Sequence, residues 1–451
     1  MNMSATASVD NTLSVSRRKR NAQPLAFDEY TGDIRRLIWL YIILWLIEGG
    51  LRRWVLPGLA TPLLLIRDPV AVLIYWKAFS KNVFPKNGFI TAGVILVLLT
   101  FASAMMVGHG NPIVALYGVR CDFLHVPLIF IMGRVLRQRD LVTLAKVAIW
   151  LVIPYTALLM AQFHEPQSAW VNRGVGGSLD GAGFSGAEGH FRPPGTFSFI
   201  TGPSELYPLF TACWFVLLLQ RKLPVWLMMA SGVAILVAIP ISISRTLCLE
   251  VIIVALVGVA AMVVGGRLST VTIVQISLAV IILPIIAIQI PTFQDGLSAF
   301  GSRWETSTVA TGGFKASILD RAFDDLFGSF SDVDIFGLGT GYSTNVGQQL
   351  LTQNVGIGAA ESEWGKLLFD NGLMLGSAMI VYRVSLTGFI FLAAFRSRQH
   401  SFAQGLVFFS AACLLVLEGQ WSQPSTIGAA VITGGLTLAA SNLPSEDGLS
   451  N

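Results

Sequence analysis

The stretch "AIPISISRTLCLEVIIVALVG", residues 238 to 258, places Arg245 and Glu250 inside one of the most apolar parts of the chain. Apolar runs of this kind cross the hydrocarbon core of a bilayer, which takes about 20 helical residues. A charge within such a run costs at least about 2.5–3.5 kcal/mol, so it usually faces a polar cavity, a partner or a substrate. The stretch therefore predicts a membrane helix and, for Arg245, an anionic group to hold.

The composition of the whole chain indicates a membrane protein. Of its 451 residues, 53% are hydrophobic and only 12% are charged, whereas about 25% is usual in a soluble domain. The net charge of +4 is therefore a topology signal rather than a sign of nucleic-acid binding. The four cysteines lie far apart in apolar segments without C-x-x-C spacing, which indicates neither a disulfide framework nor a metal site.

The pattern of apolar segments predicts an all-α polytopic membrane protein with about twelve transmembrane helices. The predicted spans lie near residues 37–49, 62–79, 88–107, 112–132, 141–163, 203–219, 223–241, 246–265, 269–290, 371–395, 402–418 and 425–441. Residues 37–441 then form one transmembrane domain, between tails at 1–36 and 442–451.

Basic residues predict the orientation of these spans. With the N-terminus in the cytoplasm, the inner loops hold most of the flanking basic residues: Lys81, Lys86, Arg134, Arg137, Arg139, Arg221, Lys222, Arg267, Arg396 and Arg398. The short outer loops after the third and eleventh spans hold none, and cytoplasmic loops are typically enriched in Lys and Arg. Both termini are therefore predicted to be cytoplasmic.

Two of the predicted outer loops are long, at 164–202 and 291–370. The first is rich in glycine. In the second, apolar residues recur at three- and four-residue spacing over 314–330. That periodicity predicts an amphipathic helix that lies on the membrane face or caps a cavity.

Several arginines fall on the predicted outer side, where the topology rule does not account for them. They are Arg52, Arg53, Arg173, Arg192, Arg245, Arg303 and Arg321. A guanidinium group binds phosphate in a planar, bidentate manner and stays charged, so several of them around an outer cavity would suit a diphosphate. The alternative is that each arginine reaches lipid headgroups or pairs with a carboxylate such as Glu48, Glu250 or Glu305.

Four runs between residues 190 and 376 have a recognisable order. They are "FRPPGTFSFITGPSELYPLF" (191–210), "SISRT" (242–246), "SRWE" with "LDRAFDDLFGSFSDVDIFGLGTGYS" (302–343), and "ESEWGKLLFDNGLMLG" (361–376). Taken together they resemble the O-antigen ligase and Wzy-type polysaccharide polymerase superfamily. In the first third of the chain, "EGGLRRW" and "IRDP" are similar to its exopolysaccharide branch.

The resemblance implies a GT-C-type glycosyltransferase at the periplasmic face of the bacterial inner membrane. Such an enzyme transfers a glycan from undecaprenyl diphosphate to an acceptor, without a nucleotide sugar, metal or other cofactor. By resemblance, Arg192 and Arg245 hold the donor diphosphate, and Arg303 and Arg321 lie in the third run and are predicted to join them. Fixed cations in a low-dielectric site would stabilise the leaving diphosphate.

Three residues are candidates for the catalytic base. Glu361 stands where ligases of the family carry a histidine, which favours a polymerase over a ligase. The spacing from Gly372 to Gly376 is one residue longer than usual in the family, so Glu363 is an alternative to Glu361. His190, just before Arg192, is the third candidate.

The leading hypothesis is a polymerase that extends an exopolysaccharide or O-antigen repeat. Its partners would be the lipid-linked donor, a glycan acceptor, the bilayer, and chain-length regulator and flippase proteins. The second hypothesis is a ligase that moves the finished glycan to lipid A core or to a protein. The third is a flippase or other transporter, which should show internal repeats that the sequence lacks.

Overall fold

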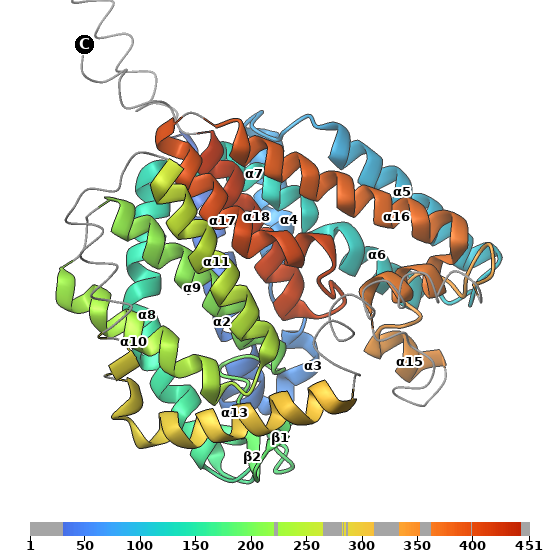
Figure 1. Cartoon of the computed structure of the whole chain (residues 1–451). Helices are drawn as coiled ribbons and strands as arrows, with labels where there is room; N and C mark the ends of the chain where they lie inside the picture. The colour runs from blue at the N-terminus through green and yellow to red at the C-terminus, as the bar shows by residue number, and fades with distance from the viewer. Residues whose placement is uncertain are drawn as a thin grey trace, which may run out of the picture.

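The computed structural model describes residues 30–220, 224–264, 282, 284–285, 287–310, 333–351, 362–397 and 399–442. These residues are mostly helical (Figure 1). Seven helical stretches among them are long and apolar enough to cross a membrane. They are Pro57–Ser80, Gly88–Met106, Pro112–Val135, Gln138–His164, Thr201–Gln220, Arg245–Val264 and Glu363–Phe395. The protein is therefore membrane-embedded and helical, as its composition predicts.

The described α-helices follow the order of the predicted spans. They are α2 (Gly32–Gly50), α3 (Ala60–Leu63), α4 (Asp68–Ser80), α5 (Gly88–Met106), α6 (Pro112–Val119), α7 (Val126–Val135), α8 (Gln138–His164), α9 (Thr201–Gln220), α10 (Val225–Ile241), α11 (Arg245–Val264), α13 (Pro291–Ala310), α15 (Asn345–Leu351), α16 (Glu363–Phe395), α17 (Gln399–Leu417) and α18 (Pro424–Ser441). One-turn π-helices, η1 (Leu51–Val55) and η3 (Arg120–Leu124), follow α2 and α6. Short 3-10 turns occupy Pro57–Leu59, Trp170–Asn172 and Val175–Gly177.

Helices α9 and α18 lie at the centre of the bundle. Helix α18 packs against α7 and α17, and α9 packs against α8, α11 and α17. Helices α5 and α11 instead expose large apolar side chains such as Leu98 and Leu256, which are 62% and 65% exposed. Because soluble proteins rarely leave so much contiguous apolar surface in water, these outer faces are suited to lipid.

One end of the bundle, which we call the tail end, holds both ends of the described chain. At this end Lys81 Nζ lies 2.6 Å from a carboxylate oxygen of Asp33, near the start of α2. Asn442 Nδ2, just after α18, donates to Gly133 O at 3.1 Å. The start of α2, the end of α4, the end of α7 and the end of α18 therefore meet there.

The opposite end, which we call the loop end, holds the starts of α9, α11 and α18. Thr201 Oγ1 at the start of α9 donates to Gln423 Oε1, just before α18, at 2.9 Å. Ser204 on α9 and Ser244 just before α11 share a hydrogen bond of 3.0 Å between their hydroxyl oxygens. The described parts of the segments predicted as long outer loops lie at this end.

Those two segments contain regular structure. In the first, β1 (Phe184–Ala187) and β2 (His190–Arg192) form an antiparallel hairpin, the one sheet of the described residues. In the second, residues expected in a loop form α13, which crosses the loop end beside the hairpin and the end of α10 (Figure 1). Helix α13 is too polar to read as a membrane span, and the expected amphipathic helix over 314–330 falls outside the described residues.

Candidate functional site

The β-hairpin brings separate parts of the chain together at the loop end. Its turn uses Glu188 and Gly189, both with positive φ. On one side, Arg303 Nη1 of α13 lies 3.5 Å from Gly186 O. On the other, a Cβ at Gly186 would lie 2.7 Å from Ile243 Cδ1, in the α10–α11 turn. The hairpin is thus in contact with α13 and with the residues that precede α11.

Three of the arginines predicted to bind a diphosphate converge here: Arg192 on β2, Arg245 at the start of α11 and Arg303 on α13. We call them the arginine cluster. Burial, and then the charges of Arg303 and Arg245, lower the pKa of Arg192 to about 10. Arg192 Nε is buried and has no hydrogen-bond partner among the described residues. Cations that disfavour one another's charge, with an unused donor, form an attractive site for an anion.

The turn "SIS" before Arg245 explains the position of that arginine. Ser242 Oγ accepts a hydrogen bond from Ser244 N at 3.2 Å, and Ser244 Oγ accepts one from Leu247 N at 3.3 Å. Ile243 between them has φ +47, a strained value for a β-branched residue. Ser244 therefore caps α11, and Arg245 stands at the helix N-terminus, where the helix dipole also favours an anion.

Two of the predicted site residues cannot be placed. Arg321, the fourth predicted phosphate ligand, and Glu361, the first candidate base, fall outside the described residues.

His190, the third candidate base, lies beside the cluster. It is two residues from Arg192 on β2, and alternate strand residues share a face. Its ring stacks on Phe163 with centroids 4.0 Å apart, and Nδ1 lies 3.2 Å from Phe163 O. Because Nδ1 is engaged by α8, proton exchange with a ligand would fall to Nε2.

Glu363, the second candidate, is held in a buried ion pair. Its side chain accepts from Arg383 Nη1 at 2.8 Å and from Trp421 N at 3.3 Å. The Arg383 guanidinium lies 4.1 Å from the centroid of the Trp421 ring. Glu363 is thus paired with Arg383, whereas His190 lies beside the arginine cluster, so its position favours His190 over Glu363 as a base that acts at the cluster.

Arg53 has a structural explanation. It is 1% exposed, and its guanidinium donates to four backbone carbonyls of the segment that follows α8. The acceptors are Val171, Arg173, Gly195 and Phe197. It thereby fastens the end of α2 to the segment that leads into α9.

Pairing with a carboxylate accounts for two further arginines near the end of α2. Glu48 lies 3.2 Å from Arg67 Nε and 3.5 Å from Arg52 Nη1. Glu48 and Arg67 are 5% and 1% exposed. Arg52 therefore pairs with Glu48, which is the alternative expected for the outer arginines.

One buried polar residue near the site, Glu205, could not be predicted from the sequence. Glu205 follows Ser204 on α9, is 4% exposed, and accepts a hydrogen bond from Thr426 Oγ1. Its Oε2 is buried without a partner in the described part of the chain. A single glutamate at the start of an apolar segment gives no pattern from which such a position could be predicted.

Comparisons of the chain with protein-family models, with curated proteins and with solved structures find no match. What the site can do follows from its own geometry. Three guanidinium groups from three elements, one of them with a buried unused donor, are suited to bind adjacent phosphate groups by several charge-assisted hydrogen bonds.

Proposed function

We propose that this protein is a membrane glycosyltransferase that polymerises an oligosaccharide repeat carried on undecaprenyl diphosphate. The observation that carries the proposal is the convergence of Arg192, Arg245 and Arg303 at the loop end of a membrane-embedded helical bundle. Each of the three lies in, or directly before, a run that resembles the O-antigen ligase and Wzy-type polymerase superfamily.

In the proposed reaction, the arginine cluster stabilises the leaving diphosphate. A hydroxyl oxygen of the acceptor sugar attacks the anomeric carbon of the donor glycan, and the bond from that carbon to the diphosphate oxygen breaks. The electron pair of the broken bond stays on the diphosphate, where preorganised cations stabilise the developing charge. The hydroxyl proton passes to a base. His190 is our preferred base because it shares a strand face with Arg192, and Glu361 is the alternative.

We further propose twelve membrane crossings, with both termini in the cytoplasm and the loop end in the periplasm of a bacterial inner membrane. Two findings support this topology. The described chain begins and ends at the same, tail end, beside Lys81. In the sequence, the predicted span at 269–290, most of which falls outside the described residues, follows α11, which starts at the loop end, and precedes α13, which packs there. The arginine cluster would then face the side on which lipid-linked repeats are extended.

Reconstitution tests the proposal. The purified protein is placed in vesicles with the undecaprenyl-diphosphate-linked repeat from the cells that carry it, and the products are separated by length. We expect a ladder of longer glycans from the wild-type protein. Arg245→Lys should lose most of the ladder, because an ammonium group cannot reproduce the planar fork of a guanidinium.

Arg134→Lys is the matched control, since Arg134 is exposed at the end of α7. It should extend the donor as the wild-type protein does. A full ladder from well-folded Arg245→Lys and Arg245→Ala would refute the assignment of the cluster. In a parallel reaction that also contains lipid A core, a single transfer to it with no ladder would make the protein a ligase.

A further inference from the structure

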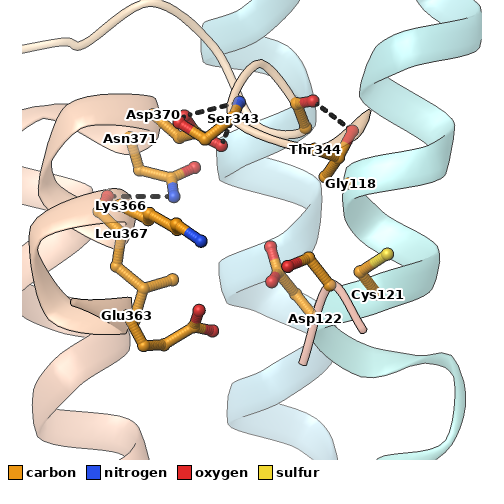
Figure 2. A pocket seen from close by; sticks show the side chains of 12 residues that line it. Gly118, Cys121, Asp122, Ser343, Thr344, Glu363, Lys366, Leu367, Asp370 and Asn371 are labelled. Carbon is orange, nitrogen blue, oxygen red and sulfur yellow. Dashed lines mark hydrogen bonds between the residues drawn. The ribbon is translucent and has the colours of Figure 1, made fainter. Parts of the chain in front are cut away.

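A second polar site lies at the loop end, in a pocket between α16 and the α6–η3 segment (Figure 2). We call it the acidic pocket. Its lining residues are Gly118, Cys121, Asp122, Gly341, Ser343, Thr344, Glu363, Lys366, Leu367, Asp370, Asn371 and Ser422. They come from four separate parts of the sequence.

The glycine-rich turn before α15 closes the pocket and is fixed to both walls. Thr340 Oγ1 donates to Asp122 Oδ2 at 3.2 Å. Ser343 donates to the carboxylate of Asp370 through its backbone N at 3.0 Å and through its hydroxyl at 2.5 Å. Gly118 lets the turn reach α6, since a side chain there would meet Gly341 N at 2.5 Å. The pocket is therefore built by specific bonds.

Several polar groups in the pocket remain available to a ligand. Asn371 is 2% exposed, and its Nδ2 donates to Leu367 O at 3.1 Å. Its Oδ1 is buried and has no hydrogen-bond partner among the residues that the structure describes. Figure 2 shows the Asn371 amide, the Lys366 ammonium and the Asp122 carboxylate directed into the same space. A buried acceptor left without a donor is costly, so Asn371 Oδ1 calls for a ligand donor.

These groups favour a neutral, hydroxyl-bearing ligand over a metal ion. Within the described ranges, no group of three or more potential metal ligands could hold a metal. Asp370 is already bonded to Ser343, and Glu363 to Arg383. The Lys366 ammonium would also repel a cation. Hydroxyl groups both donate and accept hydrogen bonds, so they can satisfy Asp122 and Asn371 as acceptors and Lys366 as a donor.

The α17–α18 loop connects the acidic pocket with the arginine cluster. Ser422 of this loop lines the pocket, and its neighbour Gln423 accepts a hydrogen bond from Thr201 at the start of α9. Ser204, on the first turn of α9, is bonded to Ser244, which directly precedes Arg245. The loop thus touches the pocket on one side and the helix that leads to the cluster on the other.

We propose that the acidic pocket binds a sugar ring of the glycan acceptor through its hydroxyl groups, with Asp122, Asn371 and Lys366 as the residues that recognise it. This assignment rests on the proposed glycosyltransferase function, because it supplies the acceptor half of that reaction. The pocket would be a second binding site, separate from the diphosphate site, and these three residues would select the acceptor.

Direct binding tests the pocket without relying on catalysis. The probe is a set of neutral oligosaccharide fragments from partial acid hydrolysis of the polysaccharide of the cells that carry the protein. Saturation-transfer NMR on the full-length protein in nanodiscs should detect these fragments. Asp122→Asn and Asn371→Leu should each weaken binding about tenfold or more, because each removes an acceptor from a buried site.

Asp334→Asn is the matched control, because Asp334 is an exposed carboxylate in the same outer segment that does not line the pocket. It should bind the fragments as the wild-type protein does. Equal binding by the wild-type protein and both pocket variants would overturn the assignment, as would an absence of binding to the folded wild-type protein.

A second experiment distinguishes the proposed sugar site from the proposed glycosyltransferase function. Arg192→Lys should lose polymer formation but keep fragment binding, which supports the pocket as a distinct site. Fragment binding that depends on Asp122, in a protein that forms no polymer from any lipid-linked donor, would refute the proposed function and leave the sugar site standing. Polymer formation with no dependence on Asp122 or Asn371 would refute the pocket and leave the function standing.

Discussion

The arginines near the loop end divide into two kinds by the partners they have. Arg53 is enclosed by backbone carbonyls, whereas Arg192 has a buried donor without a partner in the described chain. The first kind maintains the fold, and the second kind is available to a ligand. Substitutions should separate the two.

Arg53→Lys should reduce stability. An ammonium group cannot reach the four carbonyls that the guanidinium bonds, and each buried carbonyl left unpaired costs about 1–3 kcal/mol. We expect a lower thermal midpoint, measured on the detergent-solubilised protein, with the activity of each folded molecule unchanged. An unchanged midpoint, equal to that of Arg134→Lys, would show that Arg53 does not fasten the segment.

Arg192→Gln should have the opposite effect on the empty protein. The pKa of Arg192 is lowered to about 10 in the fold, so between that pH and its ordinary value of 12.5 the unfolded chain binds more protons. Stability therefore rises with pH between about 10 and 12.5, and at pH 8 the charged side chain destabilises the fold. Arg192→Gln should then raise the midpoint at pH 8 in low salt.

Inorganic pyrophosphate supplies the complementary measurement. At about 100 times its dissociation constant, an anion that binds the cluster should stabilise the wild-type protein by about 2.7 kcal/mol. The same addition should have a much smaller effect on Arg192→Gln. Equal stabilisation of both proteins would place the bound anion elsewhere.

At the scale of elements, α16 depends on a break near its start. Gly372 has φ +74 and ψ 176, a conformation that is essentially open to glycine alone. A side chain there would lie 2.4 Å from Ile335 O. The break lets the glycine-rich turn pack against α16, and so it helps to shape the acidic pocket.

Gly372→Ala should therefore destabilise the protein by at least about 2–3 kcal/mol, from backbone strain and overlap combined. Gly388→Ala is the control on the same helix, because a side chain at Gly388 meets nothing within 4 Å. It should be neutral or stabilising by about 0.5–1 kcal/mol. Yield of folded protein and thermal midpoint measure both, and equal values would contradict the role of the break.

Hydropathy predicts the apolar helices, whether they face lipid or protein, and misses the polar ones. The predicted span 88–107 matches α5, Gly88–Met106. Helix α16 begins at Glu363, and the predicted start at 371 coincides with the break at Gly372; the turns before the break were not predicted because they contain polar residues, which are buried against other segments. Helix α13 was expected as loop because it is too polar to read as a span.

The two candidate sites also differ in how far the sequence predicts them. Arginines on the outer side of a membrane protein are unusual, so Arg192, Arg245 and Arg303 could be selected before their convergence was known. The acidic pocket could not be predicted, because all three residues are of ordinary types and Asp122 lies far from Asp370 and Asn371 in the sequence. Only the packing of η3 and the glycine-rich turn against α16 makes them neighbours.

At the scale of the whole molecule, the proposed topology places the loop end outside. Asp180→Cys, in the exposed part of the segment before β1, should react with a membrane-impermeant maleimide added to intact spheroplasts. Arg139→Cys, exposed at the tail end, should react only after the membrane is opened. The reverse pattern would invert the topology and place the arginine cluster in the cytoplasm.

The buried pair of Glu48 and Arg67 has a consequence for biogenesis. Glu48 emerges from the ribosome with α2 before Arg67 is made, and a lone charge in the bilayer costs about 2.5–3.5 kcal/mol on insertion. Arg52, made soon after Glu48, lies 3.5 Å from it, but the closer pair of Glu48 and Arg67 forms only when both segments stand side by side. Helix α2 and the segment from Pro57 to Ser80 are therefore expected to leave the translocon as one hairpin rather than one helix at a time.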